Sequence, residues 1–412
     1  MEKDRLSGLE KRWILYDVGN SAFMMLTATI LPIYFNTLAQ GAGLSEVEYL
    51  AYWGYAASVA TMLVAIIGPV LGAAADMGSR KKRLFTICIL IGAGSCAFLW
   101  APVSWLVFLV LFIISRAGYN ASLIFYDSML VDITTAERMD RVSSHGFAWG
   151  YIGSCIPFVI SLVFVLMYDA IGISMQTAMT AVFLLNAIWW GLSAVPLLRS
   201  YRQRDSGIQD DRVRGCFRRL WETLKEIRGQ RHIVLYLAAF FFFIDGVYTI
   251  IEMATAYGSS LGLDTQGLLL ALLVTQIVAF PCALVISVLS GRFGTAGLLK
   301  ACILAYTGIA LFAVQLDKQW EFWFLAVFVG MFQGGIQALA RSYFAKIVPA
   351  EKSGEYFGIY DICGKGASFL GTTLTGFVAQ ATGNPSLGVA AIAVLFVIGY
   401  IMFGRAVRAQ ET

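Results

Sequence analysis

The chain has 412 residues, of which 58% are hydrophobic and only 14% charged, and its mean hydropathy is +0.73. A water-soluble domain cannot bury so large an apolar fraction, so this composition excludes an ordinary soluble protein. The sequence divides into apolar runs of roughly 20 residues, about the length that crosses a bilayer core ~30 Å thick as a helix. Because lipid offers no partner to backbone amides, we expect these runs to be helices.

Twelve membrane-spanning helices are predicted, which makes the fold class an all-α polytopic membrane protein. The longest polar break carries ten Lys and Arg residues and separates the sixth helix from the seventh. We therefore expect an N-terminal six-helix bundle at 1–198, a basic cytoplasmic linker at 199–232 and a C-terminal six-helix bundle at 233–412. Within the linker, the amphipathic stretch 217–227 is expected to lie on the membrane surface. The predicted helices are 13–36, 49–75, 84–100, 104–131, 147–168, 176–198, 233–255, 266–290, 296–315, 321–345, 356–381 and 385–404.

An internal repeat supports the division into halves. The stretch 15–21 resembles 243–249, and 146–153 loosely parallels 357–364. Repeats of six helices related by an axis along the membrane normal place a substrate site at their interface, near the midplane. The repeat therefore predicts a secondary transporter that moves a small solute by alternating access.

The basic residues follow the positive-inside rule. Nearly all of the 30 Lys and Arg residues lie in or beside one set of alternating connections, and only Lys318 lies in the opposite set. This asymmetry predicts that both termini are cytoplasmic, and it explains the basic residues better than nucleic-acid binding does. We expect the membrane to be a bacterial inner membrane. The seven Cys are scattered singly, so neither a metal nor another cofactor is expected. The two His, the absence of an HExxH pattern and the absence of a phosphate-binding loop argue against an enzyme and against ATP-driven transport.

Helix 233–255 carries three polar residues on one face, Asp245, Thr249 and Glu252. Ionisable groups inside hydrocarbon usually face a cavity or a partner. Burial of Asp245 without a fixed cation would favour the protonated acid, so Asp245 and Glu252 are candidates for proton coupling and for substrate contact. The alternative is a permanent structural role, such as an ion pair or a cap at a helix break near Gly246.

Helix 104–131 places Arg116 and Asn120 on one face near mid-depth. A buried guanidinium presents a fork that suits a carboxylate, either of a substrate or of the protein. A fixed ion pair with Asp17, Asp245 or Glu252 is the structural alternative, and Gln side chains in such helices often bridge neighbouring helices. The other polar residues predicted to line the cavity are Asp17, Asn20, Gln276, Gln333 and Gln337.

The loop at 72–82 reads Gly-Ala-Ala-Ala-Asp-Met-Gly-Ser-Arg-Lys-Lys. It resembles the signature loop of the major facilitator superfamily, approximately GxLADRxGRK, although Met77 replaces the usual Arg and Gly78 comes one place early. The corresponding loop of the second half, 290–294, has no acidic residue. The resemblance implies that Asp76, with Arg80 beside it, helps to hold helices together on the cytoplasmic side.

Further motifs resemble the unknown-major-facilitator group, which includes the autophagy-related vacuolar amino-acid effluxers. They lie at 16–23, 32–35, 245–250, 337–342 and 357–361, and so extend over nearly the whole chain. The resemblance implies efflux of amino acids, by a protein expected to act as a monomer. Arg116 is not part of the group's pattern, which makes it a candidate for substrate selectivity.

The fourth and tenth helices of this superfamily, which correspond to 104–131 and 321–345 here, approach each other at the cytoplasmic mouth. The repeat sets Asp127 opposite Arg341, and Asp132 opposite Lys346, as symmetry mates of opposite charge. We therefore predict that these pairs form a cytoplasmic gate. Lys365 either joins the gate or only neutralises Asp361, four residues earlier on the same helix. The alternative is that all are ordinary charges at helix ends.

A lipid or amphiphile exporter on the same fold is the second functional hypothesis. Its cavity should be more apolar and should open sideways between helices. The expected partners are a small-molecule substrate, membrane lipid and a coupling proton or cation. The direction of transport and the coupling ion stay open at this point.

Overall fold

The chain folds into helices throughout the described residues of a computed structural model, which omits residues 1–4, 78–79, 102–103, 205–212, 261–262 and 412. The elements are α1 (Gly8–Ala28), α2 (Ile30–Gly41), α3 (Glu46–Asp76), α4 (Lys81–Ala97), α5 (Trp105–Ile133), α6 (Met139–Ile171), α7 (Met175–Ser200), α8 (Val213–Gly229), α9 (Arg231–Ser260), α10 (Thr265–Phe293), α11 (Thr295–Ala313), α12 (Gln319–Ile347), the 3₁₀ turn η3 (Ala350–Lys352), α13 (Ser353–Thr382) and α14 (Pro385–Glu411).

Each of the twelve predicted spans corresponds to helix in the structure, with one break. The first span is divided at Thr29 into α1 and α2. Pro32 has no backbone N–H to donate to the carbonyl four residues earlier, that of Ala28, so the first helix ends there. Ten of the described stretches, with α1 and α2 counted as one, are long and apolar enough to cross a membrane. The other two predicted spans are α4, which packs on α5 and α7, and α13, which packs on α3, α9 and α14.

Capping boxes fix where two helices begin. At α1, the Ser7 side chain accepts the Glu10 backbone N–H, and the Glu10 carboxylate accepts the Ser7 backbone N–H. Ser45 and Glu48 make the same reciprocal pair at α3. Each box provides hydrogen-bond partners for backbone amides that the first turn of a helix leaves unpaired. The polar residue before each of these helices therefore determines where the helix begins.

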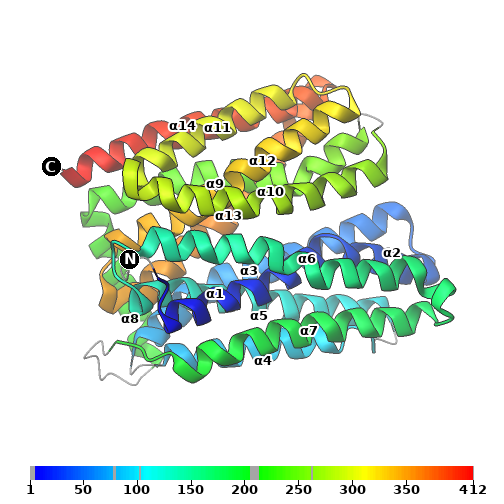
Figure 1. The fold of residues 1–412 in the computed structure, drawn as a ribbon, viewed down its shortest axis with the longest axis horizontal. Coiled ribbons are helices and arrows are strands. Elements are labelled where there is room, and N and C mark those ends of the chain that lie inside the picture. The colour runs from blue at the N-terminus through cyan, green and yellow to red at the C-terminus, as the bar shows by residue number, and fades with distance from the viewer. Residues whose placement is uncertain (1–4, 78–79, 102–103, 205–212, 261–262, 412) are drawn as a thin grey trace.

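The helices run along one common direction and form two sets (Figure 1). Helices α1 to α7 occupy one half of the bundle and α9 to α14 the other, and α8 lies at the end where both termini are found. We call this the linker end and the opposite one the far end. The two sets pack together mainly through α3 against α13 and α6 against α10. The boundaries of the two halves as independent domains stay a prediction.

Glycines bring the backbones of α3 and α13 into direct contact near the linker end. A Cβ atom built on Gly72 would lie 2.1 Å from the carbonyl oxygen of Gly354. One built on Gly358 would lie 2.8 Å from the Cα of Pro69. Backbones can approach this closely only where a side chain is absent, as is common at helix contacts within membranes. The two halves therefore fit together at this end only with glycine at these positions.

Gly72→Ala should open the linker end, because its methyl group forces α3 away from α13. Hydrogen–deuterium exchange of the peptide that contains the first turn of α13 should become faster. The matched control is Gly54→Ala on the same helix, where an added Cβ meets no atom within 4 Å. Equal exchange in the two variants would show that the glycine contact does not hold the ends together.

Candidate functional site

Arg116 and Glu252 carry opposite charges on helices of the two halves of the bundle, α5 and α9. Arg116 lies near the middle of α5 and is half-buried; its guanidinium carbon lies 5.9 Å from the Phe112 ring centroid. Glu252 lies on α9 and is exposed, although it belongs to a membrane-spanning stretch. The two charges are near enough to attract each other, yet neither side chain makes a hydrogen bond or an ion pair with another described residue. The predicted ion pairs of Arg116 with Asp17, Asp245 or Glu252 are therefore not formed in this structure.

Asp245 is a fully buried carboxylate of α9 that links α9 to α13. Its Oδ1 atom accepts the backbone N–H of Gly371 at 2.9 Å and the Thr249 hydroxyl at 3.4 Å. Its Oδ2 atom is buried without a hydrogen-bond partner among the described residues, and no described cation lies within ion-pair distance. An ionised carboxylate is costly in such a place, whereas a bound proton removes the charge. Thr249, predicted to face the cavity, is also fully buried and supports Asp245.

Lys365 and Asp361 form an ion pair one turn apart on α13, with Nζ and Oδ1 separated by 2.5 Å. Lys365 also donates to the backbone carbonyl of Asn120 on α5 at 3.0 Å. Lys365 thus neutralises Asp361 within its own helix, which is one of the two predicted alternatives, and its bond to Asn120 also connects the two halves near mid-depth.

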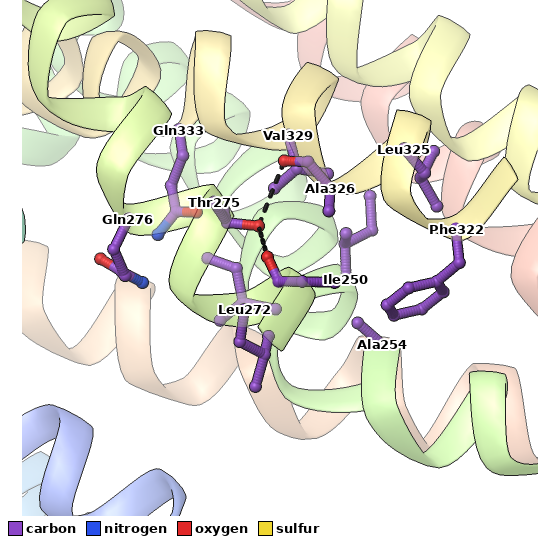
Figure 2. A pocket seen from close by; sticks show the side chains of 12 residues that line it. Ile250, Ala254, Leu272, Thr275, Gln276, Phe322, Leu325, Ala326, Val329 and Gln333 are labelled. Atoms are coloured by element: carbon purple, nitrogen blue, oxygen red, sulfur yellow. Dashed lines mark hydrogen bonds between the residues drawn. The ribbon is translucent and has the colours of Figure 1, made fainter. Parts of the chain in front are cut away.

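The three predicted glutamines lie on α10 and α12. Gln337 accepts the Tyr151 hydroxyl of α6 at 3.2 Å, a bond between the two halves. Gln276 and Gln333 lie at one end of a small pocket between α9, α10 and α12, with Phe322 at the other end (Figure 2). The volume of this pocket is about 50 Å³, which holds a few water molecules at roughly 10–15 Å³ each but no larger solute.

Arg341 of α12 is the centre of a buried charge cluster near the linker end. Its guanidinium donates to Asp127 at 3.0 Å, to Asp17 at 3.3 Å and to the Ser143 hydroxyl at 2.9 Å. These partners come from α5, α1 and α6, so one cation of the second half joins three helices of the first. The guanidinium also lies over the Phe147 and Trp13 rings, 4.3 and 4.6 Å from their centroids.

Two predicted cavity residues belong to this cluster. Asp17 is buried against Arg341, and Asn20 donates to Asp17 at 3.2 Å from one turn further along α1. In the conformation described, Asp17 therefore serves the contact between the halves rather than facing a cavity.

The predicted pair of Asp132 with Lys346 is wrong. Asp132, at the end of α5, pairs with Lys81 at 3.2 Å, whereas Lys346, at the end of α12, pairs with Asp140 at 2.7 Å. Symmetry mates touch only close to the pseudo-two-fold axis, where Asp127 and Arg341 lie. Asp132 and Lys346 lie farther from it, so each belongs to its own cluster on one side of the axis.

These two outer clusters also join the halves. In one, Lys81 of α4 donates to Ser353 at the start of α13 at 3.0 Å. In the other, Ser342 of α12 donates to Asp140 at the start of α6 at 2.6 Å. Tyr201, just beyond α7, donates to Asp132. Burial and the Asp132 carboxylate raise the pKa of Tyr201, which keeps this hydroxyl a donor.

Asp76, the acidic residue of the signature loop, lies at the N-terminus of α13. Its two carboxylate oxygens accept the backbone N–H groups of Gly354 at 3.0 Å and Glu355 at 2.9 Å. These amides have no partners within the first turn of a helix, and the helix dipole favours a negative charge there. Arg80 immediately precedes α4 and is half-buried. Gly78, quoted in the same motif, lies outside the described residues.

We call the contacts of Arg341, Asp76, Lys81 and Asp140 across the two halves the linker-end seal. Among the residues that make these contacts, sequence reasoning missed Lys81 and Asp140, and also Ser143, which bonds to Arg341. Lys81 and Asp140 had a signal in the sequence, since each is a charge in a loop between predicted spans. Ser143 is an ordinary serine of a small-residue stretch, and only its contact with Arg341 distinguishes it.

The family model described as "Vacuole effluxer Atg22 like" matches residues 9–410. The uncharacterized MFS-type transporter YxiO of Bacillus subtilis is 40% identical over 404 residues, which cover 97% of this chain and 94% of YxiO. Autophagy-related protein 22-2 of Emericella nidulans is 27% identical over 293 residues, which cover 63% of this chain. The matched region spans 49% of that fungal protein, about half of its length.

Solved structures give the same fold. The major facilitator transporter FucP in its outward conformation superposes with a TM-score of 0.74 at 15% identity, covering 97% of each chain. The proton:xylose symporter XylE superposes with a TM-score of 0.71 at 13% identity, covering 96% of this chain and 94% of XylE. These comparisons confirm the predicted all-α major facilitator fold, and the relatives are transporters rather than enzymes. The chain belongs to the Atg22-like vacuole effluxer family, and it is a multi-pass membrane transporter of the major facilitator superfamily.

Proposed function

We propose that the protein carries a small zwitterion, an amino acid or a close relative, across the membrane by alternating access. The observation that supports this most is the pair of opposite charges in the membrane-spanning region, Arg116 and Glu252, neither of which makes a hydrogen bond or an ion pair with another described residue. A guanidinium suits a carboxylate, and a carboxylate suits an ammonium group. A zwitterion between them would satisfy both, and each half of the bundle would contribute one contact.

The second part of the proposal concerns how the linker-end seal controls access to these two charges. Contacts of Arg341, Asp76 and Asp140 join the halves at this end, which supports the proposal that the seal is closed here and that the solute reaches Arg116 and Glu252 from the far end. Opening the seal while the far end closes would present the same two charges to the other side. The excess of basic residues in the connections at the linker end supports a cytoplasmic position for it and for both termini. The family description, which names an effluxer, supports efflux as the direction of transport. We further propose that the protein acts as a monomer.

A thermal-shift screen of the purified protein tests the substrate class. The panel contains the twenty standard amino acids, their decarboxylated amines, their deaminated acids, sugars and phospholipids. The proposal predicts stabilisation by one or more amino acids, and weaker stabilisation by the matching compounds that lack either charged group. Stabilisation by a sugar or a phospholipid alone would contradict it.

Asp245 is the proposed proton carrier. Asp245→Asn should abolish transport driven by a pH gradient but preserve exchange of labelled for unlabelled solute, because exchange moves no net protons. Both are measured in proteoliposomes. The matched control is Asp169→Asn, since Asp169 is exposed at the far end. Unchanged gradient-driven transport in the Asp245 variant would exclude this residue as the carrier.

Export of a lipid or amphiphile is the second candidate function. The observation that favours it is a groove of about 1020 Å³ between α1, α6 and α7, which is open and almost wholly apolar. Its walls include Trp149, Trp189 and Ile188, and Ser193 places one hydroxyl group among the lining side chains. A groove on the outer side of one half suits an acyl chain better than a zwitterion. Stabilisation by phospholipids that Ile188→Ala in this groove weakens, without stabilisation by any amino acid, would favour this function.

A further inference from the structure

The helix α8 has one face packed against the bundle and one face left open. Thr223 and Ile227 are buried, and Leu220 is half-buried. On the opposite side Arg218, Trp221, Lys225 and Arg228 follow one another at spacings of three and four residues, so they form one stripe. All four are exposed, Trp221 to 61%, and Leu224 beside them is exposed to 40%.

The exposed stripe is positively charged around a single indole. Lys225 lies over the Trp221 ring, with its Nζ atom 5.7 Å from the ring centroid. Glu222 also lies on this side, where it pairs with Arg218 at 2.9 Å, and Lys225 and Arg228 leave a positive excess. An exposed Trp flanked by basic residues is typical of helices at the boundary between headgroups and acyl chains.

The position of α8 brings the stripe close to the membrane. The membrane-spanning stretch of α9 begins at Arg231, only three residues after Arg228. At this depth a basic helix meets the phosphate groups of the lipids, and anionic lipids attract it by charge complementarity.

We propose that the stripe Arg218, Trp221, Lys225 and Arg228 binds the headgroups of anionic phospholipids in the leaflet at the linker end. Bound lipid would also favour closure of the seal, because α8 is tied to the start of α13. Thr223 donates to Glu355, and Lys352 of η3 pairs with Glu226 at 2.5 Å. Glu355 in turn supplies one of the two amides that Asp76 accepts. The inference does not depend on the identity of the transported solute.

The test uses the full-length protein in detergent, titrated with phosphatidylglycerol or phosphatidylcholine, with melting temperature as the readout. The triple variant Arg218→Gln, Lys225→Gln, Arg228→Gln should need at least tenfold more phosphatidylglycerol than the wild type, since each basic residue near an anionic surface contributes about fivefold. The matched control, Lys11→Gln, Lys82→Gln, Arg83→Gln, removes three exposed charges at the same end but away from α8. It should behave like the wild type. Equal loss in both variants, or equal stabilisation by the two lipids, would overturn the proposal.

A second measurement locates the lipid without relying on stability. The protein has 10 Trp, and the difference in fluorescence between the wild type and Trp221→Phe isolates the indole of α8. Phosphatidylglycerol with brominated acyl chains should quench this difference signal more than brominated phosphatidylcholine does. Added salt should reduce that excess, because it screens the charges. Absence of quenching by either lipid would place Trp221 away from the membrane and contradict the proposal.

Discussion

Replacing Arg116 by Ala should weaken amino-acid binding by about 10- to 100-fold, the loss expected for one hydrogen-bonded contact to a charged group. The fold should persist, because Arg116 makes no hydrogen bond or ion pair with another described residue. The dissociation constant is measured by calorimetry on the purified protein, with the amino acid that stabilises it most in the thermal-shift screen. The matched control is Ile114→Ala on the same helix, where Ile114 is exposed to 40%. Equal affinity in both variants would remove Arg116 from the site.

Ligands that lack one charged group test which end of the amino acid each residue contacts. Arg116→Ala should no longer distinguish the amino acid from its decarboxylated amine. Glu252→Gln should lose the preference for the amino acid over its deaminated acid, because the amide carries no charge to meet an ammonium group. The opposite assignment, with Glu252 sensitive to the carboxylate, would mean that these residues do not contact the ligand as proposed.

Arg341→Gln should open the linker end. The substitution leaves Asp17 and Asp127 buried without their cation in the closed state, a penalty of about 3–5 kcal/mol. Water reaches both acids once the end opens, so the closed state alone is destabilised, and the equilibrium moves toward opening by roughly 100-fold or more. Hydrogen–deuterium exchange should therefore rise in peptides from the linker-end turns of α6 and α13.

Two comparisons make the result specific. Arg83→Gln removes an exposed charge at the same end and should exchange like the wild type. Reversing both charges, Asp127→Arg with Arg341→Asp, should not restore closure, because the new acid at position 341 would face Asp17. Full rescue by that double variant would show that Asp17 contributes nothing to the seal.

Much of the fold could be predicted because membranes impose simple rules. Spans of roughly 20 apolar residues and basic connections are visible in sequence, and the structure has helix at all twelve predicted positions. The break at Thr29 could also have been read from Pro32, three residues later. The helix-to-helix contacts could not be predicted, because hydrophobic periodicity identifies the buried face of a helix but not the helix that packs against it.

The site shows the same limit. Asp127 and Arg341 were matched correctly because symmetry mates near the axis touch, whereas the same rule failed for Asp132 and Lys346 away from the axis. Asp17 and Arg116 looked alike in sequence, each a charge inside a hydrophobic helix. Only the packing distinguishes them: Asp17 is paired with Arg341, whereas Arg116 makes no hydrogen bond or ion pair with another described residue.

Counterflow in proteoliposomes tests the central claim most directly. Vesicles containing purified protein are loaded with an unlabelled amino acid and diluted into a trace of the same compound carrying a radioactive label. We predict transient accumulation of label with the wild type, and strongly reduced accumulation with Arg116→Ala and with Glu252→Gln at the same trace concentration. Absence of accumulation for every standard amino acid, or full accumulation in both variants, would contradict transport of a zwitterion held between these two charges.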